Sequence, residues 1–221
     1  MRKIIIGKNS KLFKNYSVEF TERFDFFLSH TDIERFKFES NDCVLLLSYP
    51  NSKPQLDIMK NSLLKLTHSK VIILSTCAVI VSKLTNCYFY PKIKLLQEKY
   101  VAEVLNNFLI YRVGTIVRER DYIKYIGTCV LDSKVFFNEL DSFIKFDFEH
   151  RIITSVKTLD FEGGTIEKFI YKNYCFLIST LSFCPCILRP LDLILRIFGR
   201  SWYGYGALTR IMMEKTSKHD L

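Results

Sequence analysis

Glycine and proline are scarce in this 221-residue sequence, at 8 and 5 residues, so long flexible linkers are not expected. The 7 cysteines form no CxxC pair, and the 4 histidines lie far along the chain from Cys184-Pro-Cys186. Because a metal site needs clustered ligands, none is predicted. The N-terminal apolar run is too short for a signal peptide, and free thiols suit a reducing compartment, so we expect a cytoplasmic protein.

Apolar and positively charged residues, in contrast, are plentiful. Hydrophobic residues make up 48% of the sequence, enough for a substantial core in one domain or in one domain with a small appendage. The formal net charge of +9 suits an anionic partner such as nucleic acid, an acidic membrane surface or a phosphate-bearing small molecule. Lysines and arginines are spread without a basic tract, so we predict no nucleic-acid partner.

Short apolar runs alternate with helical patterns over the first half of the chain. Strands are expected at 3–7, 24–28, 43–48, 71–75 and 108–113, with helices at 56–66 and from residue 90 onward. This alternation predicts an α/β fold, a Rossmann-like parallel sheet flanked by helices, over residues 1–118. Residues 119–221 are expected to form a small mixed subdomain, with a strand at 152–161 and a helix beginning near Thr165.

Tyr90 and Lys94 are four residues apart at the start of an expected helix, and Pro91 suits its first turn. One helix face therefore presents a phenol and an ammonium group one turn apart. A nearby cation favours phenolate and lowers the pKa of a tyrosine toward the range useful for proton transfer. The alternative is an ordinary amphipathic helix that carries a chance pair.

Four features in order resemble the extended short-chain dehydrogenase/reductase family, especially its nucleotide-sugar epimerases and reductases. They are the strand end at 74–80, the Tyr-x-x-x-Lys-x-x-x-Glu match at Tyr90, Lys94 and Glu98, the strand and glycine at 111–116, and the late helix at 189–200. The likeness covers most of the chain and is strongest over residues 43–118. It implies that residues 119–221 form a substrate-binding subdomain.

The resemblance also implies catalytic roles. Tyr90 would be the acid/base that moves a sugar hydroxyl proton while hydride passes to or from nicotinamide. Lys94 would lower the pKa of Tyr90 and hold the nicotinamide ribose, and Thr76 would donate a hydrogen bond to the reacting oxygen. Thr76 has a second interpretation, since a threonine that ends a core strand often only caps the next turn.

The implied cofactor is NAD or NADP. Its binding residues would be Gly7, Lys8, Asn9, Ser10, Asp32 and Ser48, together with Tyr90 and Lys94. The family's Gly-x-x-Gly-x-x-Gly loop is reduced here to Gly7, Ser10 and Phe13, so two glycines are missing. Ser10 is expected to cap a helix that faces the pyrophosphate, whereas Phe13 is large for a close-packed position. Cofactor binding is therefore expected to be weak, unusual or lost.

The implied substrate is a nucleotide-linked sugar, epimerised or reduced in surface-polysaccharide synthesis. Its binding residues would be Thr76, Gly114, Arg189, Arg196 and Arg200. Sugar-nucleotide 4,6-dehydratases carry an Asp-Glu pair where this sequence has Cys77 and Ala78, which disfavours elimination of water. Cys77 is expected to be a buried filler.

Two other hypotheses compete with an enzyme. One is a catalytically lapsed, Rossmann-like module that binds a nucleotide or a partner protein. The other is an accessory protein at the inner face of a membrane, attached through the arginine-bearing amphipathic helix at 189–200. That helix would otherwise close the substrate-binding subdomain or form a dimer contact. The family resemblance implies a homodimer through two helices per subunit, one of them the Tyr90 helix.

Overall fold

The computed structural model describes residues 1–47, 53–83, 88–125, 127–146, 150–158, 165–181, 187, 190, 193–194 and 204–217. The chain forms two compact units. The first consists of Met1–Ser75, Ile93–Arg112 and Val135–Thr154, and the second of Thr76–Lys92, Val113–Lys134 and Ser155–Leu221. The domain boundary at residue 118 and the substrate-binding role of residues 119–221 stay predictions.

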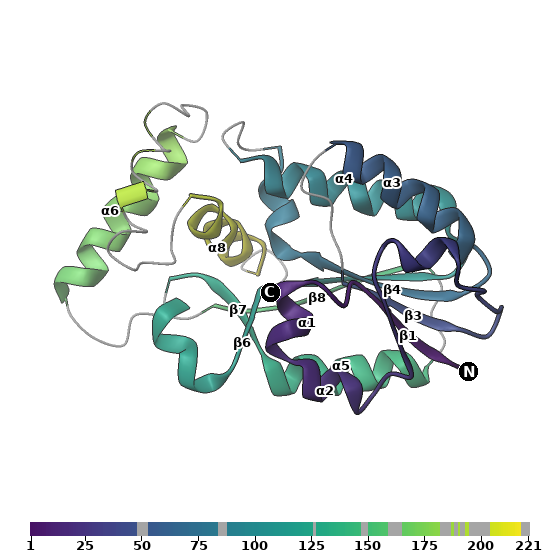
Figure 1. Cartoon of the computed structure of the whole chain (residues 1–221). Helices are drawn as coiled ribbons and strands as arrows, with labels where there is room; N and C mark the ends of the chain where they lie inside the picture. The colour runs from purple at the N-terminus through teal and green to yellow at the C-terminus, as the bar shows by residue number, and fades with distance from the viewer. Residues whose placement is uncertain are drawn as a thin grey trace. The chain divides into compact units, whose positions relative to one another are not determined.

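The first unit is built on a six-stranded sheet in the order β2-β1-β3-β4-β5-β8 (Figure 1). Its strands are β1 (Lys3–Ile6), β2 (Phe26–Leu28), β3 (Cys43–Leu46), β4 (Lys70–Thr76), β5 (Phe108–Val113) and β8 (Arg151–Ser155). β1 runs parallel to both β2 and β3, and β3 runs parallel to β4. The predicted α/β fold with a Rossmann-like parallel sheet is confirmed.

Helices cover both faces of this sheet (Figure 1). On one side lie α3 (Lys53–Leu63) and α4 (Phe89–Val104), and on the other lie α1 (Lys11–Asn15), α2 (Ser17–Thr21) and α5 (Ser133–Lys145). Successive strand residues point to opposite faces, so Ile4 and Ile6 of β1 join a core with Met59 and Val101 from the first pair of helices. Both faces of the strands are apolar because both are covered.

The opposite face is packed mainly by aromatic rings. Phe20 of α2 lies 5.1 Å from Phe137 of α5, and Tyr111 of β5 stacks on Phe136 at 5.8 Å, between ring centroids. Helix α5 was not predicted, although Phe136, Leu140 and Ile144 recur at the helical spacing of four. Acidic residues between the aromatic ones obscured that period.

The second unit carries a three-stranded mixed sheet in the order β6-β7-β9. β7 (Cys129–Asp132) pairs in parallel with β6 (Thr115–Val117) and antiparallel with β9 (Lys157–Thr158). Helices α6 (Thr165–Leu181) and α8 (Gly204–Ser217) pack together, and the short 3-10 helices η3 (Cys77–Val81) and η4 (Glu119–Tyr125) complete it. No helix in the described part of the chain is long and apolar enough to cross a bilayer.

One strand prediction needs correction. The single strand expected at 152–161 is two strands, β8 ending at Ser155 and β9 beginning at Lys157, and residues 159–161 lie outside the described residues. The two strands belong to different sheets, since β8 neighbours β5 and β9 pairs with β7. A local pattern of apolar residues carries no information about the partner of a strand.

The chain between β2 and β3 is short. Residues 29–42 contain only one 3-10 turn, η1 (Asp32–Glu34), and β2 is the only described strand on the far side of β1. The usual dinucleotide-binding order places two strands there, so this edge of the sheet has one strand fewer. The neighbours of β1 are β2 and β3, which puts the topological switch point at the carboxyl end of β1.

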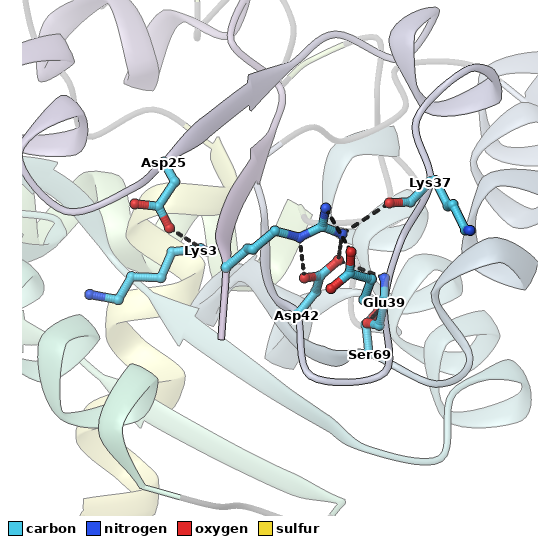
Figure 2. Close-up of polar contacts among 7 residues, drawn as sticks. Lys3, Asp25, Lys37, Glu39, Asp42 and Ser69 are labelled. Atoms are coloured by element: carbon cyan, nitrogen blue, oxygen red, sulfur yellow. Dashed lines mark hydrogen bonds and ion pairs between the residues drawn. The ribbon is translucent and has the colours of Figure 1, made fainter.

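A partly buried ion pair stabilises the opposite, amino-terminal edge of this sheet (Figure 2). The Arg2 guanidinium donates to both carboxylate oxygens of Asp42, at 2.8 and 2.7 Å, and to the Lys37 carbonyl at 3.0 Å. Burial disfavours the charged form of Asp42, but the Arg2 hydrogen bonds and the Glu39 amide outweigh it, so the pKa of Asp42 is held below its usual value.

Replacing Asp42 with asparagine is expected to destabilise the protein by about 2 kcal/mol and to lower Tm by about 4–8 °C, since it removes the charge that pairs with Arg2. Because the folded-state pKa of Asp42 is depressed, its stabilisation is present at neutral pH and is lost as pH falls below about 4. Thermal melts of both proteins should therefore converge in acid. Glu39→Gln is the control, and an equal loss there would contradict the assignment.

Candidate functional site

The turn after β1 keeps one glycine of the predicted dinucleotide loop. Gly7 has φ 114°, a backbone conformation that residues with a side chain rarely adopt. The Gly7 and Lys8 amides donate to the Leu28 carbonyl at 2.8 and 3.1 Å, which ties the turn to the end of β2. The Ser10 hydroxyl accepts from the Phe13 amide at 3.1 Å, so the predicted N-cap of α1 is confirmed.

Lys8 and Asp32, both predicted to contact the cofactor, bind each other. The Lys8 ammonium lies 2.8 Å from the Asp32 carboxylate, which also accepts from the Ser29 amide at 2.7 Å. The Lys8 hydrogen bond, followed by the Ser29 amide, holds the pKa of Asp32 well below its usual range. Asn9 is exposed in the same turn. Polar side chains thus gather where β1 and β2 end, at their carboxyl ends.

Phe13 takes the position at which the family has its third glycine. Its ring stacks on Phe20 at 5.7 Å between centroids and lies 5.5 Å from Phe27. The large side chain of Phe13 therefore packs against neighbouring aromatic residues of the first unit. A glycine at this position would let the helix approach the sheet closely, and here Phe13 of the short helix α1 occupies that position.

Thr76 is the last residue of β4 and caps the 3-10 helix η3 that follows. Its hydroxyl oxygen accepts from the Ala78 amide at 3.2 Å, and its side chain is half-buried. Next to it, the Cys77 thiol is buried, and its hydrogen bond with Cys129, followed by burial itself, raises the pKa of that thiol. A thiol with a raised pKa is a poor nucleophile, which agrees with the expectation that Cys77 is a filler.

Tyr90 lies in the first turn of α4, as the sequence predicted. Its half-buried ring lies 5.5 Å from the ring of Tyr205 in α8, measured between centroids, and Tyr88 packs on the same ring at 5.6 Å. Tyr205 therefore holds two tyrosines at the beginning of this helix. This contact could not be predicted from local patterns, because 115 residues separate Tyr90 from Tyr205.

Lys94 follows one turn later in α4, and its side chain is only 2% exposed. The ammonium donates to the Leu74 carbonyl of β4 at 3.0 Å and to the Gln97 side-chain oxygen at 3.1 Å. Burial lowers the pKa of Lys94 to about 7, and the Glu98 carboxylate opposes the change. A lysine of this kind exists as a mixture of amine and ammonium at neutral pH.

The lowered pKa of Lys94 predicts a stability that depends on pH. Between about pH 7 and pH 10 the unfolded chain binds a proton that the folded chain lacks, so the free energy of unfolding rises with pH, by at most about 1.4 kcal/mol per unit. Lys94→Met should remove that part of the slope in denaturant titrations across the range. Exposed Lys99→Met is the control, and an unchanged slope for Lys94→Met would refute the lowered pKa.

Glu98 of the same helix forms a buried network that sequence reasoning had noted only as a motif match. It accepts from the Ser75 hydroxyl at 2.6 Å and from two Arg112 nitrogens at 3.1 and 2.6 Å. These bonds join the end of β4, the middle of α4 and the end of β5. A glutamate four residues after Lys94 was the only sequence signal for this network.

Gly114 was predicted to contact the substrate, and the structure gives it a packing role. A Cβ atom added there would lie 2.6 Å from the carbonyl oxygen of Cys129, far closer than van der Waals contact. Only glycine lets the chain pass this close to β7. Its role toward a substrate stays a prediction.

The predicted site residues divide between the two units. The first unit brings Gly7, Lys8, Asn9, Ser10 and Asp32 to the carboxyl ends of β1 and β2, and also holds Lys94, while the second contains Thr76, Tyr90 and Gly114. Ser48, Arg189, Arg196 and Arg200 lie outside the described residues. Within those described ranges, no group of three or more histidine, cysteine, aspartate or glutamate side chains could hold a metal ion.

Comparison with known proteins finds similarity in fold. No protein-family model matches the sequence, and no curated protein matches it. A dTDP-4-dehydrorhamnose reductase from Bacillus anthracis, solved with NADP, has a TM-score of 0.54 at 13% identity, over 78% of this chain and 81% of that one. The Bordetella bronchiseptica enzyme WbmG, solved with NAD and UDP, has a TM-score of 0.51 at 11% identity, over 79% and 78%.

A UDP-N-acetylglucosamine 4-epimerase from Bacillus cereus has a TM-score of 0.50 at 10% identity, over 71% of this chain and 76% of that chain. The predicted resemblance to the extended short-chain dehydrogenase/reductase enzymes is therefore confirmed as a structural similarity at low sequence identity.

Proposed function

We propose that this chain, which shares the fold of the extended short-chain dehydrogenases/reductases, is a cytoplasmic NAD(P)-dependent epimerase or reductase of a nucleotide-linked sugar. The observation that carries the proposal is the arrangement of α4. This helix places Tyr90 and the buried Lys94 one turn apart, and the pKa of Lys94 is lowered to about 7. A buried lysine with a strongly shifted pKa is more typical of a functional site than of an amphipathic helix.

The turn after β1 in the first unit supports the proposal of a dinucleotide site. Gly7, with its positive φ, turns the chain at the topological switch point, where such ligands bind, and Ser10 caps the following helix. Phe13 packs on the rings of Phe20 and Phe27, so neighbouring aromatic residues accommodate its large side chain. Lys8 would meet a phosphate of the cofactor and Asp32 a ribose hydroxyl, with Asn9 and Ser48 beside them.

Three side chains would act on the substrate. Tyr90 would exchange a proton with the sugar hydroxyl, and Lys94, when protonated, would favour the phenolate that accepts it. The Thr76 oxygen accepts from the Ala78 amide, and its hydroxyl would turn from its hydrogen bond with the Cys77 thiol to donate to the reacting oxygen. A bound nicotinamide would supply hydride transfer.

The substrate class follows from charge and from the similar enzymes. The net charge of +9 suits a diphosphate-bearing substrate together with a dinucleotide. Two of the similar structures are named for nucleotide-sugar conversions, and a third was solved with NAD and UDP. Gly114, Arg189, Arg196 and Arg200 complete the proposed substrate site. Surface-polysaccharide synthesis and a homodimer are parts of the same proposal.

Cofactor binding to the purified protein tests this function. Calorimetric titration with NAD, NADH, NADP and NADPH should show binding, and Lys94→Ala and Asp32→Ala should each weaken it about tenfold or more by removing a charge-assisted hydrogen bond. Exposed Glu34→Ala, in the same turn as Asp32, is the matched control. Thermal melts exclude misfolding of the variants.

Absence of binding for all four cofactors would favour a lapsed nucleotide- or partner-binding module. One observation favours that second candidate. The Gly7 and Lys8 amides are already bonded to Leu28, and Lys8 already neutralises Asp32, so the loop is satisfied without a ligand. The Asp32 carboxylate could still accept a ribose hydroxyl at its other oxygen, but its charge is already paired with Lys8.

A further inference from the structure

Helix α6 of the second unit carries an exposed apolar stripe that the proposed chemistry does not use. Its residues recur at spacings that keep side chains on one helix face, and they are Ile166, Phe169, Ile170, Phe176 and Leu177. Ile166, Phe169 and Phe176 are 77%, 68% and 70% exposed. Contiguous exposed side chains of this size mark a surface that binds another partner.

The other apolar side of α6 is already occupied. Tyr171, Tyr174 and Ile178 are buried and pack with Ala207 and Leu208 of α8. The Tyr171 hydroxyl also donates to the Gly127 carbonyl at 2.7 Å. The helix is thus held to its own unit along one face, and the stripe lies on a different face.

Polar side chains along the same helix bond to its own backbone. The Asn173 amide donates to the Phe169 carbonyl at 2.8 Å, and the Ser179 and Thr180 hydroxyls donate to the Phe176 and Leu177 carbonyls at 2.8 and 2.9 Å. Hydrocarbon offers no hydrogen-bond partners, so these internal bonds lower the cost of bringing the polar side chains against it.

Charge on α6 favours an anionic surface. Lys168 and Lys172 are both exposed, one turn apart, at the edge of the stripe. Glu167 is the only acidic residue in the sequence of this helix. Lysines that flank an apolar stripe can bind lipid phosphates while the apolar side chains contact hydrocarbon. Their long stems keep the ammonium group in the polar layer.

We propose that α6 docks this protein on an anionic lipid bilayer. The stripe lies in the boundary between headgroups and acyl chains, and Lys168 and Lys172 contact lipid phosphates. Helix α6 lies parallel to the membrane plane, because its other face, which contains Tyr171 and Tyr174, stays packed against α8. Helix α6 is a different part of the sequence from the arginine-bearing segment 189–200, and the docking does not depend on the proposed enzyme activity.

Flotation with vesicles tests the proposal on the full chain. Wild-type protein should float with phosphatidylcholine vesicles that contain phosphatidylglycerol, and less with phosphatidylcholine alone or at high salt. Phe169→Gln with Phe176→Gln should lower the partition coefficient at least about tenfold. Lys168→Glu with Lys172→Glu should lower it on anionic vesicles by about fivefold or more for each lysine.

The matched control removes two equally exposed apolar side chains of the first unit, Ile58→Gln with Leu64→Gln, at 57% and 58% exposure. It should leave flotation unchanged. Failure of the wild type to float, or an equal loss in the control, overturns the proposal. The proposal is also overturned if the protein does not float and the variant Phe169→Gln with Phe176→Gln changes its oligomeric state, measured by light scattering. In that case the stripe joins copies of the chain. Circular dichroism verifies that each variant is folded.

Discussion

Tyr90→Phe is expected to lower turnover of a nucleotide-linked sugar by about 10²–10⁴-fold and to leave cofactor affinity within about twofold. The substitution removes only the hydroxyl that would carry the proton. The ring that packs 5.5 Å from Tyr205 remains, so the beginning of α4 should keep its structure. Turnover is measured by nicotinamide absorbance or product chromatography over a panel of nucleotide sugars, and cofactor affinity by calorimetry.

Tyr88→Phe is the matched control for this experiment. Its ring packs on the same Tyr205, at 5.6 Å, but Tyr88 precedes α4 and lies outside the Tyr-x-x-x-Lys spacing. It should retain nearly full turnover. If Tyr90→Phe turned over at the wild-type rate, Tyr90 would not be the acid/base. If both variants lost activity equally, the hydroxyls would serve the tyrosine packing and not the proton transfer.

Glu98→Ala is expected to destabilise the first unit by about 3 kcal/mol and to lower its Tm by about 6–12 °C. The carboxylate is buried and accepts from Ser75 and twice from Arg112. Its removal leaves the partly buried Arg112 guanidinium without its carboxylate and the buried Ser75 hydroxyl without an acceptor. Calorimetry or circular dichroism melts measure the change.

Glu103→Ala, an exposed glutamate in the same helix, should change Tm by about 1–2 °C or less. Arg112→Lys should recover only part of the stability, because lysine cannot form the two parallel bonds of a guanidinium. Equal melting temperatures for Glu98→Ala and Glu103→Ala would mean that the network contributes nothing, and that Glu98 does not hold α4 to β4 and β5.

The first five strands of the first unit could be predicted from local patterns. Apolar runs such as Cys43–Leu46 and Phe108–Val113 are continuous because the sheet is covered on both faces, and continuous runs are recognisable in a sequence. The cap at Ser10 followed from its position before a helical pattern. Strand pairing did not follow in the same way. The split between β8 and β9 depends on neighbours that are distant in sequence.

The candidate site shows the same division between local and distant information. The spacing of Tyr90 and Lys94 is a property of one helix, so the sequence contained it. The Lys8–Asp32 pair and the burial of Lys94 against the Leu74 carbonyl needed the folded chain. Lys8 and Asp32 were both assigned to a cofactor, and only the folded structure reveals that they bind each other.

By itself, the sequence determined the α/β class, the places of β1 to β5 along the chain, the helical spacing of the candidate catalytic pair and the loss of two loop glycines. These follow from backbone periodicity and from residues close together in the chain. Only the tertiary structure decided that Phe13 packs on other aromatic rings, that Glu98 joins Ser75 and Arg112, and that the pKa of Lys94 falls to about 7. The physical reason is that burial and long-range hydrogen bonds depend on which distant segments fold against each residue.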